Sequence, residues 1–129
     1  MTTLKLKAIH RILLKEMIDA DGKKGHSLSE LNKLNKILDK VEFTEEELRD
    51  LNLRLENGAF HWNVKKPKEE GSEEMVDIDI DKDFELSDEQ AKMLYNILKE
   101  KDENKGFQRS EVGPFMDLAE QLEYEVEVD

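Results

Sequence analysis

The chain has 129 residues, a length typical of one domain, and charged residues make up 40% of it. It contains no cysteine, which excludes a disulfide framework, a thiolate nucleophile and a cysteine-based metal site and fits a reducing, cytoplasmic compartment. No apolar run approaches the ~20 residues of a membrane helix, and the periodic apolar residues favour a folded chain over a disordered one.

The N-terminal part of the chain predicts three helices. Ile9, Leu13 and Met17 recur at helical spacing within the first, which covers about residues 4–18. Two capping boxes, each a Ser or Thr whose hydroxyl bonds the amide of a Glu three residues later, open the next two helices. They are Ser27 with Glu30, opening a helix over about residues 28–42, and Thr44 with Glu47, opening one over about residues 45–51.

A β-hairpin follows these helices. Asn57-Gly58 lies between two alternating runs, and this pair is typical of a type I′ turn, which needs positive φ at both central residues. The predicted strands cover about residues 53–56 and 59–64. One face then carries four apolar side chains, Leu53, Leu55, Phe60 and Trp62. We expect this face to be buried under the flanking helices, with an exposed aromatic platform as the alternative.

The C-terminal half predicts one more strand and two more helices. Residues 65–74 have no apolar pattern and predict a mobile loop. Val76, Ile78 and Ile80 then alternate with aspartates, which indicates a strand over about residues 75–81. The remaining elements are a helix over about residues 88–100, opened by a capping box of Ser87 and Gln90, a helix over about residues 111–123, and an alternating tail at 124–128 that could add a strand.

These elements predict an α+β fold in a single domain over residues 1–129. Two helical hairpins and a short helix would surround a small antiparallel sheet of three strands, or four if the tail pairs.

Charge is distributed unevenly along the chain. Residues 1–68 carry 14 Lys/Arg and 11 Asp/Glu, a balance of +3, whereas residues 69–129 carry 6 and 21, a balance of −15. One interpretation is a solvated acidic surface that keeps the protein soluble, and the other is a surface for a basic protein partner. Direct binding of nucleic acid is not expected, because phosphate repels such a surface.

The second interpretation gives a candidate partner-binding site. Three aspartates share one face of the predicted strand over 75–81, and further carboxylates follow into the next helix. The candidate residues are Asp77, Asp79, Asp81, Asp83, Glu85, Asp88 and Glu89. We expect them to meet Lys and Arg of the partner, in a way that would imitate nucleic acid; the oligomeric state stays open.

A spacing of 81 residues aligns the two predicted helical hairpins without a gap, for example Asp21 and Gly25 with Asp102 and Gly106. Either the helix–loop–helix is duplicated, or both hairpins follow the same capping and packing rules. The aligned loops have the length of an EF-hand calcium loop, and the second offers oxygen ligands at Glu100, Asp102, Asn104 and Glu111. Lysine stands in both loops where the sharp turn needs glycine. A degenerate, calcium-responsive module is therefore an alternative function.

Catalysis is not predicted. His10, His26 and His61 lie in different elements without metal spacing, and each is expected at the surface or in a helix cap. No nucleophile elbow, Walker loop or dinucleotide fingerprint is present, so no cofactor is expected. A structural or assembly subunit, held head-to-tail by its basic and acidic halves, is the third alternative.

Two short motifs carry a resemblance. The segment Phe43–Leu48 (Phe-Thr-Glu-Glu-Glu-Leu), the pair Trp62-Asn63 and the order of elements are similar to small acidic proteins of phages and prophages of Gram-positive bacteria. The resemblance implies a phage accessory protein acting in the host cytoplasm, and it implies no activity and no site residues.

Overall fold

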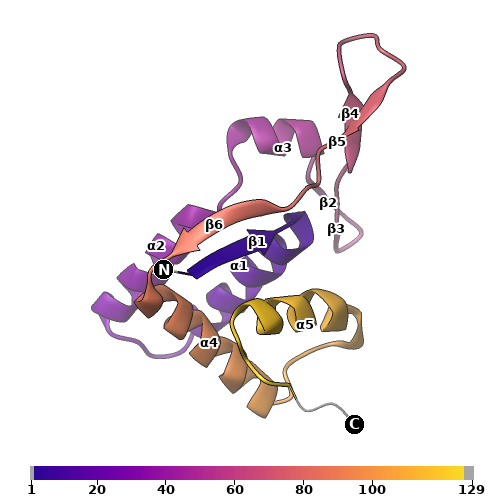
Figure 1. Ribbon diagram of the computed structural model, residues 1–129. Helices are drawn as coiled ribbons and strands as arrows, with labels where there is room; N and C mark the ends of the chain where they lie inside the picture. The colour runs from indigo at the N-terminus through magenta and orange to yellow at the C-terminus, as the bar shows by residue number, and fades with distance from the viewer. Residues whose placement is uncertain (1, 127–129) are drawn as a thin grey trace. The chain divides into compact units, whose positions relative to one another are not determined.

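The computed structural model describes residues 2–126, which combine five α-helices with short strands (Figure 1). In chain order the elements are β1 (Thr2–Leu6), α1 (Ala8–Gly22), α2 (Leu28–Val41), α3 (Glu45–Leu51), β2 (Arg54–Glu56), β3 (Ala59–His61), β4 (Lys65–Pro67), β5 (Met75–Asp77), β6 (Lys82–Leu86), α4 (Asp88–Glu103), the 3-10 turn η1 (Arg109–Glu111) and α5 (Val112–Gln121). The α+β prediction holds at this level. The prediction of one sheet of three or four strands is wrong, because these residues form three separate antiparallel pairs, β1–β6, β2–β3 and β4–β5.

The residues group into two compact units. Unit 1 comprises Met1–Val41 and Lys82–Asp129, and unit 2 comprises Glu42–Asp81. The prediction of a single domain over residues 1–129 stays a prediction.

Unit 1 begins with a strand where the sequence predicts a helix over 4–18. Leu4 and Leu6 alternate with polar residues and are completely buried, which is the period of a strand with one face in the core. The pairing strand β6 lies about 80 residues away in the chain, so local periodicity could not reveal it. The helix α1 starts only at Ala8, and its first turn is closed by the Lys7 amide, which donates to His10 Nδ1 at 3.0 Å.

The predicted strand over 75–81 is also wrong in extent. Its first part, β5, pairs with β4, which lies inside the predicted loop over 65–74. A new strand, β6, then begins at Lys82 and pairs with β1. The strand β4 could not be recognised from apolar alternation, because its sequence is Lys-Lys-Pro. The central residues of the pair, Lys66 of β4 and Val76 of β5, are only half-buried.

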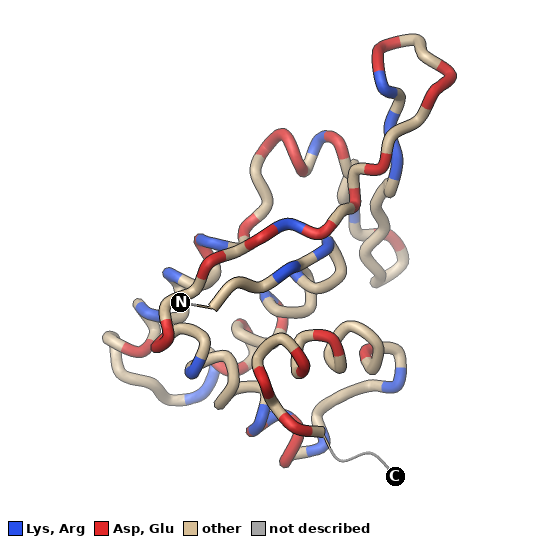
Figure 2. The backbone as a smooth tube through the Cα atoms, viewed as in Figure 1, with Lys and Arg blue, Asp and Glu red and all other residues tan. Residues whose placement is uncertain are grey.

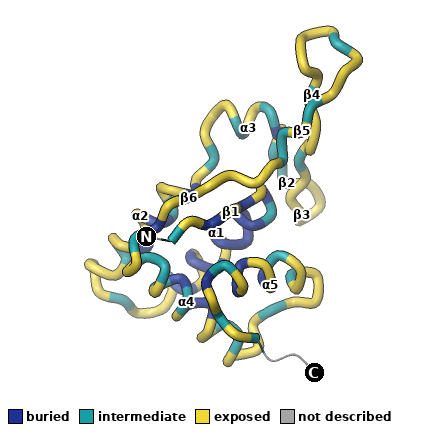
Figure 3. The backbone as a smooth tube through the Cα atoms, in the orientation of Figure 1, coloured by how far each residue is buried: buried dark blue, intermediate teal, exposed yellow. Residues whose placement is uncertain are grey.

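The core of unit 1 lies between the β1–β6 pair and four helices (Figure 3). The inward side chains of the strands and one or two from each helix are almost inaccessible to solvent: Leu4, Leu6, Leu86, Leu14, Ile18, Ile37, Leu94, Leu98 and Leu118. The helix α1 packs against α2, α4 and α5. Burial of this many aliphatic side chains makes unit 1 the stable part of the chain.

Unit 1 repeats one order of elements, because β1–α1–α2 is matched by β6–α4–α5. The two strands pair antiparallel with Leu4 opposite Phe84 at the centre of the register. The third residue of each five-residue strand thus faces the third residue of the other, so the pairing is symmetric. The first turns of α1 and α4 are closed in the same way, since Gln90 Oε1 accepts from the Ser87 amide as His10 accepts from Lys7.

The outer edges of the two strands are held by equivalent residues of the two second helices. Gln121 of α5 donates to the carbonyl of Lys5 at 3.0 Å, and Lys40 of α2 donates to the carbonyl of Glu85 at 3.0 Å. Lys40 and Gln121 are 81 residues apart, and Lys5 and Glu85 are 80 apart. The arrangement favours the duplication over the alternative of shared capping rules, because it extends to strand pairing and edge contacts.

The later helices agree with the sequence, with small shifts. The helix α4 continues to Glu103, beyond the predicted end at 100, and a 3-10 turn over Arg109–Glu111 precedes α5, which ends at Gln121. Residues 124–126 of the tail are not in a strand. The rest of the predicted tail strand, 127–128, lies outside the described residues.

Unit 2 contains α3 and the two short hairpins. The capping box of Thr44 and Glu47 opens α3 as predicted. The predicted hairpin register is confirmed, with Leu55 opposite Phe60, and the turn has φ of 51° at Asn57 and 79° at Gly58, as a type I′ turn requires.

The predicted burial of the hairpin face is wrong. Leu55 is 63% exposed and Phe60 41% exposed. Within unit 2, all of whose residues are described, Leu51 alone is buried (Figure 3). The register determines which side chains share a face, but not whether anything covers it, and a unit of this size buries little surface.

Candidate interaction surface

The seven carboxylates predicted to bind a partner do not form one row. Because the strand β5 ends at Asp77, the aspartates at 79 and 81 do not continue its solvent face. Asp77, Asp79 and Asp81 belong to unit 2, whereas Asp83, Glu85, Asp88 and Glu89 belong to unit 1.

The three aspartates of unit 2 differ in their surroundings. Asp77 lies 3.9 Å from the ammonium group of Lys65 on the paired strand. Asp79 is half-buried and accepts a hydrogen bond of 2.9 Å from Trp62 Nε1, so it has a structural task that the sequence did not reveal. Asp81 is exposed.

The four carboxylates of unit 1 lie on β6 and the first turn of α4. Asp83 and Glu85 point away from the core, since Phe84 and Leu86, which alternate with them along β6, face inward. Asp88 and Glu89 lie in the first turn of α4, where the helix dipole favours negative charge. Lys33 donates to Glu89 at 2.6 Å, and this hydrogen bond holds the pKa of Glu89 below its usual value.

Negative charge is concentrated in unit 2. Its 40 residues, 42–81, carry 5 Lys/Arg and 13 Asp/Glu, a balance of −8, and the remaining 15 and 19 give unit 1 a balance of −4. Figure 2 shows acidic residues in α3, in the loop between β4 and β5, and in the segment that follows β5. Two thirds of the net charge therefore lie in fewer than one third of the residues.

Exposed apolar side chains also gather in unit 2. Nine large apolar residues among those described are exposed, and six of these belong to unit 2: Leu48, Leu55, Phe60, Val64, Met75 and Ile80. The other three, Leu28, Val112 and Met116, belong to unit 1. Leu55 and Phe60 were missed from the sequence because the hairpin face was assigned to the core; the signal was the small number of apolar residues available to cover that face.

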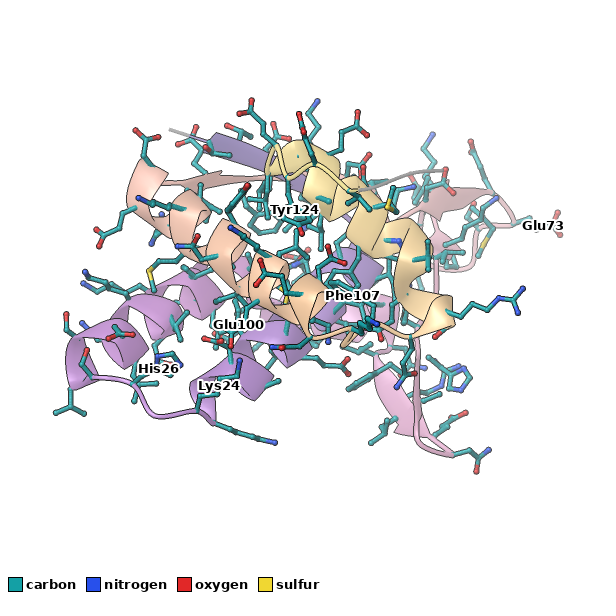
Figure 4. All side chains as sticks on the ribbon, turned by 90° about the horizontal axis from the view of Figure 1, so that it is seen from below. Lys24, His26, Glu73, Glu100, Phe107 and Tyr124 are labelled. Carbon is teal, nitrogen blue, oxygen red and sulfur yellow. The ribbon has the colours of Figure 1, made fainter. Side chains whose placement is uncertain are left out.

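A cavity of about 200 Å³ lies in unit 1, between the turn that joins α1 to α2 and one face of α4. Asp21, His26 and Glu30 line it on one side, and Glu100 lines it on the other. Figure 4 shows Lys24, His26 and Glu100 on neighbouring segments at this place. This grouping could not be predicted from the sequence, because its members come from two segments that lie far apart in the chain.

His26 joins the two helices at this turn. Its Nε2 lies 2.8 Å from the carbonyl of Asp21 and 3.2 Å from the Asp21 carboxylate, and its Nδ1 lies 3.0 Å from Glu30. The hydrogen bond to Glu30 and the one to the Asp21 carbonyl raise the pKa of His26. His26 also holds the pKa of Glu30 below its usual value. Asp21, His26 and Glu30 thus form a group of hydrogen bonds and ion pairs that links the end of α1 to the start of α2; we call this group the clamp.

The other two histidines have different surroundings. His10, expected at the surface or in a cap, closes the first turn of α1 but is buried, and its Nε2 lies 2.9 Å from Asp117 of α5. His61 is exposed on β3.

The candidate calcium ligands do not surround a common point. Glu100 and Asp102 lie within α4, where Glu100 pairs with Lys24. Asp102 accepts a hydrogen bond of 2.6 Å from Tyr124, which raises the pKa of Tyr124 to about 12. Asn104 caps the C-terminal end of α4 and Glu111 accepts from the Gln108 amide, so the start of the expected loop, residues 100–103, is helical. Over residues 2–126 there is no group of three or more His, Asp and Glu side chains placed to hold a metal ion.

Comparisons of the chain with protein-family models, with curated proteins and with solved structures find no match. Among the helices formed by residues 2–126, none is long and apolar enough to cross a membrane.

Proposed function

We propose that this protein is a non-catalytic, acidic interaction protein that binds the basic surface of another protein. The partner class is a nucleic-acid-binding protein, whose Lys and Arg residues ordinarily meet phosphate. The observation that supports this most is the concentration of negative charge in unit 2 and in the segment from Asp77 to Glu89 that leads out of it. Because Phe43–Leu48 and Trp62-Asn63 are similar to segments of phage proteins, we further propose that the chain is a phage accessory protein or inhibitor that acts in the host cytoplasm.

The mechanism is electrostatic attraction followed by docking. A net charge of −12 creates a long-range field that steers a basic partner toward the acidic surface and raises the association rate. Exposed carboxylates such as Asp81, Asp83 and Glu85 can then meet Lys and Arg directly. Screening by salt weakens both steps, since the Debye length falls from about 10 Å at 0.1 M to about 3 Å at 1 M.

The test compares two triple variants that carry the same net charge. The first neutralises exposed residues of the predicted site, D81N/D83N/E85Q, and the matched control neutralises exposed carboxylates outside that site, in unit 1, E103Q/E120Q/E125Q. Each is immobilised and exposed to the basic proteins of a Gram-positive lysate, in low and high salt and with duplex DNA as competitor.

We expect the wild type and the control to capture the same basic proteins at low salt and to release them to DNA. The site variant should capture much less. Equal loss in both variants would show that only overall charge matters, and capture by neither the wild type nor the control would contradict the proposal.

A further inference from the structure

The hairpin β2–β3 presents an apolar pair to solvent. Leu55 and Phe60 are directly opposite each other in the register, and they are 63% and 41% exposed. Both belong to the face that continues with Leu53 and Trp62, which are half-buried. Solitary exposed apolar residues are common, but a cross-strand pair on an apolar face presents a continuous surface.

Carboxylates accompany this pair. Glu56 follows Leu55 on β2 and therefore lies on the opposite face, where it pairs with Arg54, whereas Asp79 accepts from the Trp62 ring nitrogen at the base of the apolar face. The nearby cation Arg54 is already engaged, since its Nε lies 3.0 Å from Glu56 and its Nη1 donates to the carbonyl of Asn52. The apolar pair is thus set in a unit whose charge balance is −8.

We infer that the Leu55–Phe60 pair is the docking site for a basic amphipathic helix of the partner protein. The inference rests on the proposed function and names the partner element. Successive apolar residues on one face of a helix are about 5–6 Å apart, which is close to the roughly 4.5–5.5 Å between residues directly opposite each other on antiparallel strands, as Leu55 and Phe60 are. Lys and Arg on the flanks of such a helix would be attracted by the charge balance of −8 of unit 2, so the helix would complement this surface both in charge and in apolar contact.

The two kinds of contact act on different rates. Carboxylates accelerate association and make it dependent on salt, whereas a buried apolar pair slows dissociation and is insensitive to screening. Loss of the apolar pair should therefore change the dissociation rate and leave the association rate and its salt dependence unchanged.

The experiment uses the full chain and two synthetic peptides of about 18 residues, long enough for a helix. In the first peptide, leucines at helical spacing form one face and lysines the rest; the second has the same composition in scrambled order. The protein variant L55T/F60T removes the apolar pair and replaces it with threonines, which are β-branched and favour strands. The matched control L28T/V112T changes two exposed apolar residues of unit 1. Binding kinetics are measured at low and high salt, and far-ultraviolet circular dichroism and melting confirm that each variant is folded.

We expect the wild type and L28T/V112T to bind the amphipathic peptide alike, and L55T/F60T to bind it about tenfold more weakly, through faster dissociation. Equal binding of both peptides by all three proteins would overturn this inference and leave the proposed function standing. Equal weakening in L28T/V112T would also overturn it, since the apolar contact would then lie in unit 1. Failure of the wild type to bind either basic peptide would overturn the proposed function as well. If L55T/F60T does not form the hairpin, the single variants Leu55→Thr and Phe60→Thr apply the same criterion.

Discussion

The two units of this chain put their apolar residues to opposite uses. Unit 1 buries most of them between a strand pair and four helices, whereas unit 2 buries Leu51 and exposes six large apolar side chains. Unit 2 also carries a balance of −8 against −4 for unit 1. The difference separates stability from recognition: unit 1 supplies most of the free energy of folding, and unit 2 displays the side chains that meet a partner.

The largest test of this comparison exchanges one leucine for alanine in each unit. Leu94 is completely buried in the core of unit 1, so Leu94→Ala should lower the free energy of unfolding by about 2–5 kcal/mol through a cavity. Leu55 is mostly exposed, so Leu55→Ala should change the free energy of unfolding by less than about 0.5 kcal/mol. Urea denaturation followed by circular dichroism measures both. Similar losses in the two variants would show that the hairpin belongs to a core.

A smaller effect is expected at the turn of the hairpin. Gly58 has φ of 79° and open space where a side chain would lie, so Gly58→Val is costly only because of the backbone, by about 1–3 kcal/mol. Trp62, the one tryptophan of the chain, reports on unit 2 by fluorescence, and circular dichroism reports mainly on the helices of unit 1.

We expect Gly58→Val to shift the fluorescence transition more than the circular dichroism transition. Gly113→Ala, at a helical glycine with open space, is the control and should be neutral or stabilising. A Gly58→Val protein whose two transitions stay at wild-type positions would show that the turn does not need positive φ.

The smallest expected effect is the pH dependence of stability that His26 and Glu30 give to unit 1. The pKa of His26 is raised above its ordinary value of 6.5, so its contribution to stability is complete below that value and is lost as pH rises through the folded pKa. The pKa of Glu30 is lowered below 4.5, so its contribution is complete above 4.5 and is lost as pH falls. The clamp should therefore stabilise unit 1 most between these two values.

The measurement is the unfolding free energy of the wild type and His26→Gln from about pH 5.5 to about pH 8.5. We expect the wild type to be the more stable at low pH and the difference to shrink as pH rises. A difference that grows with pH would contradict the assigned contacts. His61→Gln, on the exposed strand β3, is the control and should follow the wild type.

Local signals in the sequence predicted local structure well. The three capping boxes and the Asn57-Gly58 turn all depend on residues within three positions of each other, and all are present as expected. The strand β1 could not be predicted in this way, because alternation over five residues is ambiguous until β6 supplies the partner. The burial of the hairpin face was wrong for the same reason, since burial depends on what other segments cover.

The acidic site shows the same limit. Its residues could be named from the sequence, but the row over 75–81 could not form, because β5 ends at Asp77 to pair with β4 and Asp79 bonds Trp62. The 81-residue echo was visible in the sequence. Only the three-dimensional arrangement shows that the echo includes the strands, because Gln121 and Lys40 bond equivalent strand edges.

Hydrogen–deuterium exchange of the full chain, with and without the amphipathic basic peptide, tests the division of tasks most directly. Without peptide, amides of β1, β6, α1 and α4 should exchange slowest and those of unit 2 much faster. With peptide, protection should increase over β2 and β3, residues 54–61, and stay unchanged in the core of unit 1. Slow exchange in the free hairpin, or peptide-induced protection confined to unit 1, would contradict the account.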